Sequence, residues 1–468
     1  MSFTSLDFLS FFGVVFALYW LARDRRWQNA LLLLASYVFY GWLHPWYAAM
    51  LGVSTLADFF IARGMAARPE RKRALLWLSV LVNLGVLGFF KYYNFFGPAL
   101  VGVLEGLGLQ ADPLWVRILL PAGLSFYTLK KLGYILDVSN GTLKPTHGLL
   151  DFALYVSFFP QIVAGPIDRP RSLIPQLEAA RVWRADLFHR AWPLLAMGFF
   201  KKIVIANTVG ALADRVFNLN HPNLVLIVPA ALGFTLQILA DFSAYTDLSR
   251  GFALLLGFET PENFKNPYLS LSPTEFWNRW HISLSTWLRD YVFFPLRRAL
   301  MRSQRPLPEW LVQSAPPLVT MLVSGLWHGA GWTYLAWGGM YGLLIVLYQT
   351  LGLRGEWKPQ GRVKVFLAWL VMFTFIVFGW LLFKSPSLAW AFQSLFSDPF
   401  AATLDEQAVA LVLLSTTFFY FIPLAVKLLM DRFLKPNSYL HAFYYAAAIL
   451  ATIFYLNSAA SDFIYFQF

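Results

Sequence analysis

The sequence contains no cysteine and has few charged residues for its length. Without cysteine, the chain can form neither disulfide bonds nor thiolate metal sites, and it has no thiol to carry an acyl group. Only 13% of its 468 residues are Asp, Glu, Lys or Arg, against roughly 25% in an average soluble protein. This composition excludes an ordinary soluble enzyme, because so little charge cannot cover a water-facing surface.

The chain is correspondingly rich in apolar residues. They make up 58% of the chain, and the windows 365–383 and 407–426 contain no charged residue. A helix needs about 20 mostly apolar residues to span a bilayer. The sequence therefore predicts an all-α polytopic membrane protein that forms one domain over residues 1–468. The expected apolar spans lie near residues 3–21, 29–43, 46–62, 74–96, 114–138, 149–165, 191–213, 224–241, 365–383, 407–426 and 441–457.

The net charge of +12 raises the question of nucleic-acid binding, but the basic residues cluster in short loops between apolar runs. This distribution is typical of cytoplasmic loops in membrane proteins. The basic loops are residues 22–28, 63–73, 352–364 and 431–435. If they are cytoplasmic, both chain termini and the acidic loop 385–407 lie outside. We expect the lipid bilayer as a partner, and no nucleic acid.

Some polar residues interrupt the apolar runs. Lys130–Lys131 and Lys201–Lys202 fall inside expected spans, and we favour snorkelling toward the interface over a ligand role. The segment 241–251 (DFSAYTDLSRG) carries too many polar groups to face lipid. These groups should line a cavity or form an internal network.

The segment 271–298 predicts one amphipathic helix at a membrane interface. Ser272 is expected to cap it, Pro273 to occupy its first turn and Glu275 to complete a capping box. Trp280, Leu284, Trp287 and Tyr291 then fall on one face. The segment also contains His281, which an anchoring role alone does not explain.

Two of the seven histidines stand in aromatic surroundings: His281 in NRWHIS and His328 in GLWHGAG. Neutral imidazole suits both proton transfer near neutral pH and buried hydrogen bonding. Surface or capping roles are expected for the other five, which are His44, His147, His189, His221 and His441. We expect no metal site, because the chain has no His-x-x-x-His pair and no acidic residue near His328. The G-x-S-x-G motif of a hydrolytic triad is also missing.

An ordered series of motifs carries a family resemblance. They are ASYVFYGW (35–42), KYYNFF (91–96), LPAGLSFYTL (120–129), YVSFFPQIVAGPI (155–167), DFSAYTDLSRG (241–251), PENFKNPYLSLSPTEFWNRWHISLSTWLRDYVFFPL (261–296) and GLWHGAGWTYLAWGGMYG (325–342). In this order the chain resembles the membrane-bound O-acyltransferase (MBOAT) superfamily. It is most similar to the bacterial alginate O-acetyltransferase branch, which also holds cellulose and peptidoglycan acetylators and teichoic acid D-alanyl transferases.

The resemblance implies an MBOAT fold of about 11–12 helical spans around a through-membrane tunnel. His328 would match the superfamily's catalytic membrane histidine, and His281 the histidine of the RWHIS motif. An acyl thioester, acetyl-CoA or another, would be the cytoplasmic donor substrate, with no bound cofactor. A periplasmic acetyltransferase partner would pass the acetyl group to an exported polysaccharide, first of all alginate. Acetylation of cellulose or peptidoglycan and D-alanylation of teichoic acid stay open. The expected location is the bacterial inner membrane.

Within such a tunnel, His328 can act as a general base, and acyl transfer also needs donors for the developing oxyanion. The candidate donors are the backbone N–H groups of Gly329 and Ala330, or the indoles of Trp327 and Trp332. The predicted tunnel-lining residues are Trp327, Trp332, Asp241, Ser243, Tyr245, Asp247, Asn278 and Trp280. A transporter or flippase is the alternative of another class, against which stands the absence of an internal repeat and of paired broken spans.

The C-terminal segment SDFIYFQF is unusually aromatic for a chain end. One interpretation is an aromatic anchor at the membrane interface. The other is an acyl relay, in which Tyr465 is acylated with His328 as the base and delivers the group to an external partner. The candidate catalytic residues are therefore His328, His281 and Tyr465.

Overall fold

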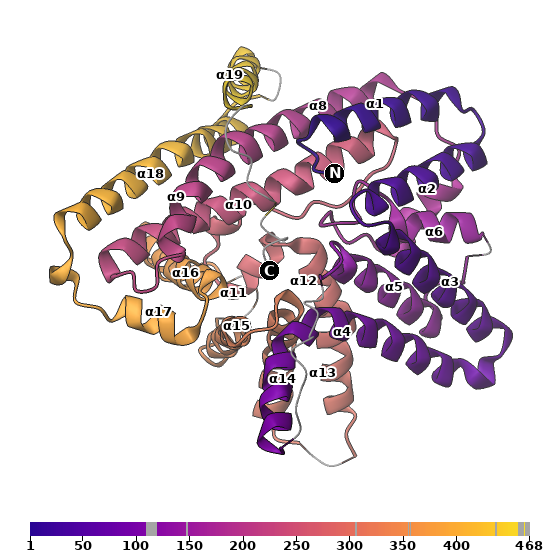
Figure 1. Cartoon of the computed structure of the whole chain (residues 1–468), viewed down its shortest axis with the longest axis horizontal. Helices are drawn as coiled ribbons and strands as arrows, with labels where there is room; N and C mark the ends of the chain where they lie inside the picture. Colours follow the sequence, from indigo (N-terminus) through magenta and orange to yellow (C-terminus); the bar gives the residue numbers. More distant parts are fainter. Residues whose placement is uncertain are drawn as a thin grey trace. The chain divides into compact units, whose positions relative to one another are not determined.

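A computed structural model describes residues 1–108, 119–146, 148–304, 307–353, 355, 357–435, 438–456 and 463. Every regular element within these residues is helical (Figure 1), which confirms the predicted fold class. The chain forms two compact units. The first comprises residues 1–191 and 252–261, and the second comprises residues 192–251 and 262–468. The expectation of a single domain stays a prediction.

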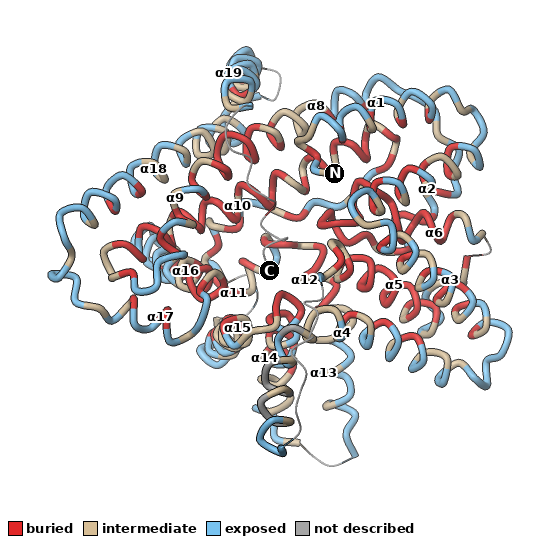
Figure 2. Tube along the Cα trace, in the orientation of Figure 1, coloured by how far each residue is buried: buried red, intermediate tan, exposed pale blue. Residues whose placement is uncertain are grey.

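The first unit contains the N-terminal helices. They are α1 (Leu6–Leu21), α2 (Arg25–Gly41), α3 (Pro45–Ala67), the 3₁₀ turn η1 (Pro69–Arg71), α4 (Lys72–Gly106), α5 (Leu124–Ser139), α6 (Leu149–Ser157) and α7 (Pro170–Glu178), followed by the start of α8. Ser5 and Asp24 cap α1 and α2 by accepting hydrogen bonds from N–H groups of the first turns. α5 is buried over nearly its whole length (Figure 2).

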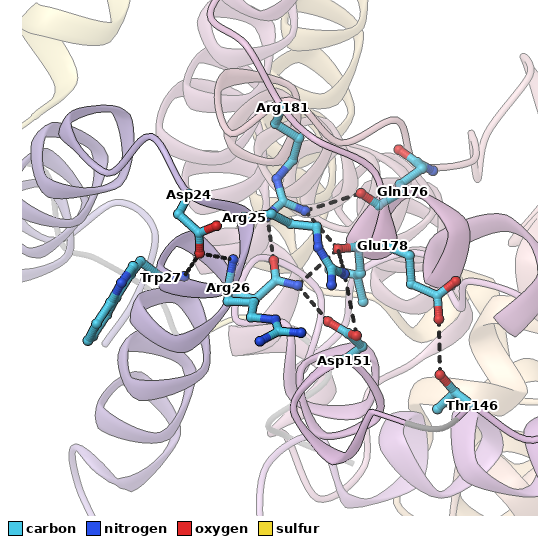
Figure 3. Close-up of polar contacts among 11 residues, drawn as sticks. Asp24, Arg25, Arg26, Trp27, Thr146, Asp151, Gln176, Glu178 and Arg181 are labelled. Atoms are coloured by element: carbon cyan, nitrogen blue, oxygen red, sulfur yellow. Dashed lines mark hydrogen bonds and ion pairs between the residues drawn. The ribbon is translucent and has the colours of Figure 1, made fainter.

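A polar cluster ties α2, α6 and the end of α7 together (Figure 3). Asn29 donates to the Asp151 carboxylate at 2.7 Å, and Arg25 approaches the same carboxylate at 3.4 Å. Arg181 donates to the side-chain oxygen of Asn29 and lies over the ring of Phe258. Arg25, from the basic segment 22–28, is thus part of a structural network.

The second unit contains the candidate site. Its helices are α8 (Ala185–Phe200, from residue 192 on), the π-helix η2 (Lys201–Ala206), α9 (Asn207–Phe217), α10 (Leu224–Leu255, up to residue 251), η3 (Pro267–Leu269), α11 (Pro273–Arg279), α12 (Ile282–Leu288), the π-helix η4 (Arg289–Phe293), α13 (Phe294–Met301), α14 (Glu309–His328), α15 (Trp332–Thr350), α16 (Arg362–Lys384), α17 (Leu388–Leu395), η5 (Pro399–Ala401), α18 (Leu404–Phe433) and α19 (Tyr439–Tyr455).

Six helical stretches among the described residues are long and apolar enough to cross a membrane: 45–67, 69–93, 185–217, 224–255, 362–384 and 404–433. Most of α18 is exposed (Figure 2). Its exposed residues include large apolar ones such as Phe418 and Phe419, as in a lipid-facing helix. The total of 11–12 spans stays a prediction. The expected span 149–165 is wrong, because α6 ends at Ser157 and the buried segment after it forms turns.

The predicted continuous helix over 271–298 is also wrong. The chain breaks at Trp280–His281, where His281 adopts left-handed backbone angles (φ 44°, ψ 51°) and α12 starts anew. Ser272 caps α11 as expected, but Glu275 accepts from the N–H of Leu271 and so does not close the predicted capping box. Trp280, Leu284 and Trp287 are buried in the protein.

The lysine pairs do not snorkel, which corrects the sequence-based expectation. All four side chains are buried. Lys131 lies 3.5 Å from Asp58 in the first unit, where Lys130 donates to Gln161 at 3.4 Å. In the second unit, Lys201 and Lys202 pair with two carboxylates of α10, at 2.7 and 2.9 Å. Partners on neighbouring helices make burial of these charges possible.

Candidate functional site

His328 is positioned by a tight helical hairpin formed by α14 and α15. A side chain at Gly338 would collide with the carbonyl oxygen of Met321, and one at Gly325 would collide with that of Tyr334. The two helices therefore approach until their backbones touch, as small residues allow in membrane bundles. His328 is the last residue of α14, where the chain turns toward α15.

The imidazole of His328 is buried and surrounded by aromatic rings. Its ring centroid lies 4.8 Å from Trp327, 5.2 Å from Trp337 and 5.2 Å from Phe383, and all three contacts are edge-on. Trp337 and Phe383 also contact each other at 5.4 Å. These side chains exclude bulk water from His328, which strengthens any electrostatic interaction made there.

Trp337 carries an unsatisfied polar atom beside His328. The side chain is fully buried, and its Nε1–H has no hydrogen-bond acceptor in the described part of the chain. A buried N–H without a partner is costly, so such a group often marks a functional site. Trp337 and Phe383 are not among the residues predicted from the sequence. Trp337 lies within the motif that contains His328, but nothing in the sequence separates it from the other tryptophans there.

His281 lies at the break between α11 and α12. Asn263 holds the backbone of this turn: its carbonyl oxygen accepts from the N–H of Ile282 at 3.0 Å, and its side-chain Oδ1 accepts from the N–H of Ser283 at 3.0 Å. The imidazole contacts the ring of Phe242 at 4.7 Å. Burial lowers the pKa of His281 to about 3, so this ring is neutral at physiological pH.

Trp327 connects the two histidines. Its ring lies 4.8 Å from His328 and 6.1 Å from His281. The structure thus brings both predicted histidines and Trp327 together in one aromatic cluster. Trp280 belongs to the same core, where it contacts Trp380 at 4.6 Å and Phe264 at 4.9 Å.

A cavity of about 230 Å³ lies beside this cluster, between α11, α12, α14 and α15. Ser324, one turn before His328 on α14, lines it together with Trp277 and the predicted residue Asn278. Trp277 contacts Trp337 at 5.6 Å, which connects the cavity wall to the surroundings of His328. Arg289 and Gln349 add polar groups to the lining.

The predicted polar cluster on α10 forms an internal network, one of the two outcomes expected from the sequence. Asp241 pairs with Lys202, and Ser243 and Asp247 accept from Lys201 at 2.8 and 2.7 Å. Tyr245 instead stacks on Phe463, with ring centroids 4.5 Å apart.

The remaining predicted residues are not part of the buried cluster. Trp332 begins α15 and is 68% exposed, so its indole is not among the buried groups around His328. Gly329 packs closely on the ring of Tyr334. Tyr465 lies outside the described residues. No group of three His, Asp or Glu side chains that could hold a metal ion occurs where the structure describes the chain.

His328 is buried at the end of one helical hairpin, and Trp327 links it to His281. Comparison with known proteins identifies the class of protein to which this arrangement belongs. The MBOAT, membrane-bound O-acyltransferase family matches residues 142–385, which include both histidines. The chain belongs to this family and is a multi-pass membrane O-acyltransferase.

Individual relatives extend the similarity over most of the chain. A probable alginate O-acetylase, AlgI, of Pseudomonas aeruginosa is 40% identical over 407 residues, covering 85% of this chain and 75% of the relative. The protein of the same name from Azotobacter vinelandii is 35% identical, covering 93% and 86% of the two chains. A peptidoglycan O-acetyltransferase of Helicobacter pylori is 29% identical, covering 84% and 78%.

Proposed function

We propose that this chain transfers an acetyl group from a cytoplasmic acyl thioester, across the bacterial inner membrane, for O-acetylation of an exported polysaccharide, with alginate as the first candidate. The observation that carries the proposal is the 40% identity to a probable alginate O-acetylase over 85% of the chain. The buried pair of His328 and Trp337 supplies a base and an unsatisfied donor for this chemistry.

In the proposed reaction, neutral His328 removes the proton of the acceptor hydroxyl while the oxygen attacks the thioester carbonyl. The indole N–H of Trp337 donates to the oxyanion that forms. Collapse of the tetrahedral intermediate breaks the carbon–sulfur bond, and the leaving thiolate takes the proton from the imidazolium. The cavity beside Ser324 receives the donor's thioester end, because it lies one helical turn from His328.

We further propose that Tyr465 is the first acceptor and that a periplasmic partner collects the acetyl group from it. Phe463 supports this role for the C-terminal segment. Its ring lies 4.5 Å from Tyr245 and 6.1 Å from Phe242, and Phe242 contacts His281. Two residues before Tyr465, the chain is thus held near His281 through Phe242.

The experiment is acetyl transfer by the purified protein from acetyl-CoA, in the presence and absence of alginate oligosaccharides. Release of CoA that depends on His328 supports the enzyme, whereas substrate movement without thioester cleavage would support a transporter. Tyr465→Phe keeps the ring and removes the hydroxyl, so it should prevent labelling of the chain by acetyl groups. A Tyr465→Phe protein that acetylates polymer at the wild-type rate leaves the segment as an anchor.

Sidedness has a separate test. Because the chain has no cysteine, single cysteines can be introduced and labelled with an impermeant thiol reagent. Positions at both termini should label from outside intact cells, and positions in loop 63–73 should not. Labelling of loop 63–73 from outside would contradict the proposed direction of transfer.

A further inference from the structure

A second cavity, of about 640 Å³, lies in the second unit, apart from the cavity beside Ser324. The first half of the stretch 185–217, the end of α10, the loop 262–267, the end of α18 and α19 form its walls. Three of these elements are membrane-crossing candidates. The cavity therefore lies where membrane helices end, next to the basic segment 431–435 that the positive-inside rule assigns to the cytoplasm.

The lining of this cavity is amphiphilic. Leu194, Met197, Leu239 and Leu424 form an apolar part. The charged part holds four cations and three carboxylates: Lys201, Arg250, Lys265 and Lys427, with Asp247, Glu262 and Asp431. The formal charge of the lining is thus only +1. A highly anionic nucleotide would need a larger excess of cations, whereas a ligand that carries both charges matches this lining.

Asn263 gives independent evidence of a ligand. The side chain is 1% exposed and borders the cavity. Its Oδ1 accepts from the backbone N–H of Ser283, which fixes which end of the amide is the nitrogen. That nitrogen, Nδ2, has no acceptor in the part of the chain that the structure describes. A buried amide donor without a partner is expected to meet one from a bound molecule.

We propose that this cavity binds the headgroup of a zwitterionic phospholipid from the cytoplasmic leaflet, with phosphatidylethanolamine as the matching chemistry. The phosphate lies toward Arg250, Lys265 and Asn263. The ammonium group lies toward Glu262, because Lys427 already pairs with Asp431 at 2.6 Å. The upper parts of the acyl chains lie along Leu194 and Leu424. Because Asn263 also holds the turn at His281, the lipid stabilises the backbone of the catalytic cluster.

The test uses the full-length protein purified in mild detergent. Native mass spectrometry of the wild type should show one retained phosphatidylethanolamine. Leu194→Trp fills the apolar part and Arg250→Gln removes a phosphate partner, so each should lower the retained fraction at least fivefold. Arg298→Gln, an exposed arginine on α13, is the matched control and should retain the lipid.

Thermal unfolding identifies the ligand class. Added dioleoyl phosphatidylethanolamine should raise the melting temperature of the delipidated wild type and not that of Leu194→Trp. Retention of the lipid by both variants would overturn the proposal. The proposal would also be overturned if acetyl-CoA, and not the lipid, raised the melting temperature of the wild type and Leu194→Trp removed that effect. The cavity would then bind the acyl donor. If Leu194→Trp does not fold, as judged by gel filtration, Arg250→Gln decides alone.

Discussion

His328 and Trp337 form a perpendicular ring pair, with centroids 5.2 Å apart and an angle of 83° between the planes. They come from the two arms of one hairpin, whose close approach depends on glycine. The indole N–H of Trp337, which has no acceptor among the described residues, therefore lies next to the proposed base.

Replacing Trp337 by Phe should keep most of the ring packing and remove the N–H. Loss of one oxyanion donor costs about 10²–10³-fold in kcat, and we expect a loss in this range with little change in KM. Trp310→Phe, at an exposed position of α14, is the matched control and should be neutral. A Trp337→Phe enzyme with wild-type kcat would remove Trp337 from the mechanism.

His328→Ala should abolish acyl transfer while the protein still inserts and accumulates. Loss of a general base typically lowers the rate by about 10²–10⁴-fold. The exposed His189 offers the matched control, and His189→Ala should have wild-type activity. Turnover of purified His328→Ala at the wild-type rate would show that the base lies elsewhere.

Gly338→Ala should destabilise the hairpin that holds His328. The added methyl group would collide with the main chain of Met321, whereas at the adjacent Gly339 the nearest atom is the end of Leu322, at 3.8 Å. Overpacking of this kind costs roughly 1–3 kcal/mol. We expect a lower melting temperature for Gly338→Ala and an unchanged one for Gly339→Ala. Equal melting temperatures would contradict the close helix contact.

Stability should fall as the pH is lowered, in part because of His281. Its folded-state pKa is lowered to about 3, below the ordinary value of about 6.5. Below pH 6.5 the unfolded chain therefore binds a proton that the folded chain does not, and stability is lost as the pH falls toward 3. When the pH is lowered from 7.5 to 4.5, the melting temperature of His281→Gln should fall less than that of the wild type. Parallel losses would mean that His281 is not buried as a neutral ring.

Replacing Lys202 alone should destabilise the protein more than replacing both Lys202 and its ion-pair partner Asp241. Lys202→Met leaves Asp241 buried in a membrane helix, and breaking a buried pair in this way typically costs about 3–5 kcal/mol. The double variant Lys202→Met/Asp241→Leu should regain much of the lost stability in thermal unfolding. A double variant less stable than Lys202→Met would argue that Asp241 has a further essential role.

The apolar helices and the two site histidines could be predicted from the sequence, because they depend on local properties of the chain. A membrane helix is specified by a run of apolar residues, so the window 365–383 predicted α16 closely and 407–426 fell inside α18. His281 and His328 are predictable as site residues because an imidazole in aromatic, uncharged surroundings is unusual and because both stand in family motifs. The structure then places them around Trp327.

Other features were decided only by tertiary contacts. The aromatic pattern 280–291 fits a continuous helix. Asn263, however, accepts hydrogen bonds from the N–H groups of Ile282 and Ser283, and the helix is broken at this point. Lys201 and Lys202 are buried because their carboxylate partners lie on α10, which no local pattern reveals. The same holds for Trp337, since only packing determines which of several tryptophans meets His328 with an unsatisfied N–H. Apolar length is a local property of the chain, whereas the partner of a buried polar group is set by residues far away in sequence.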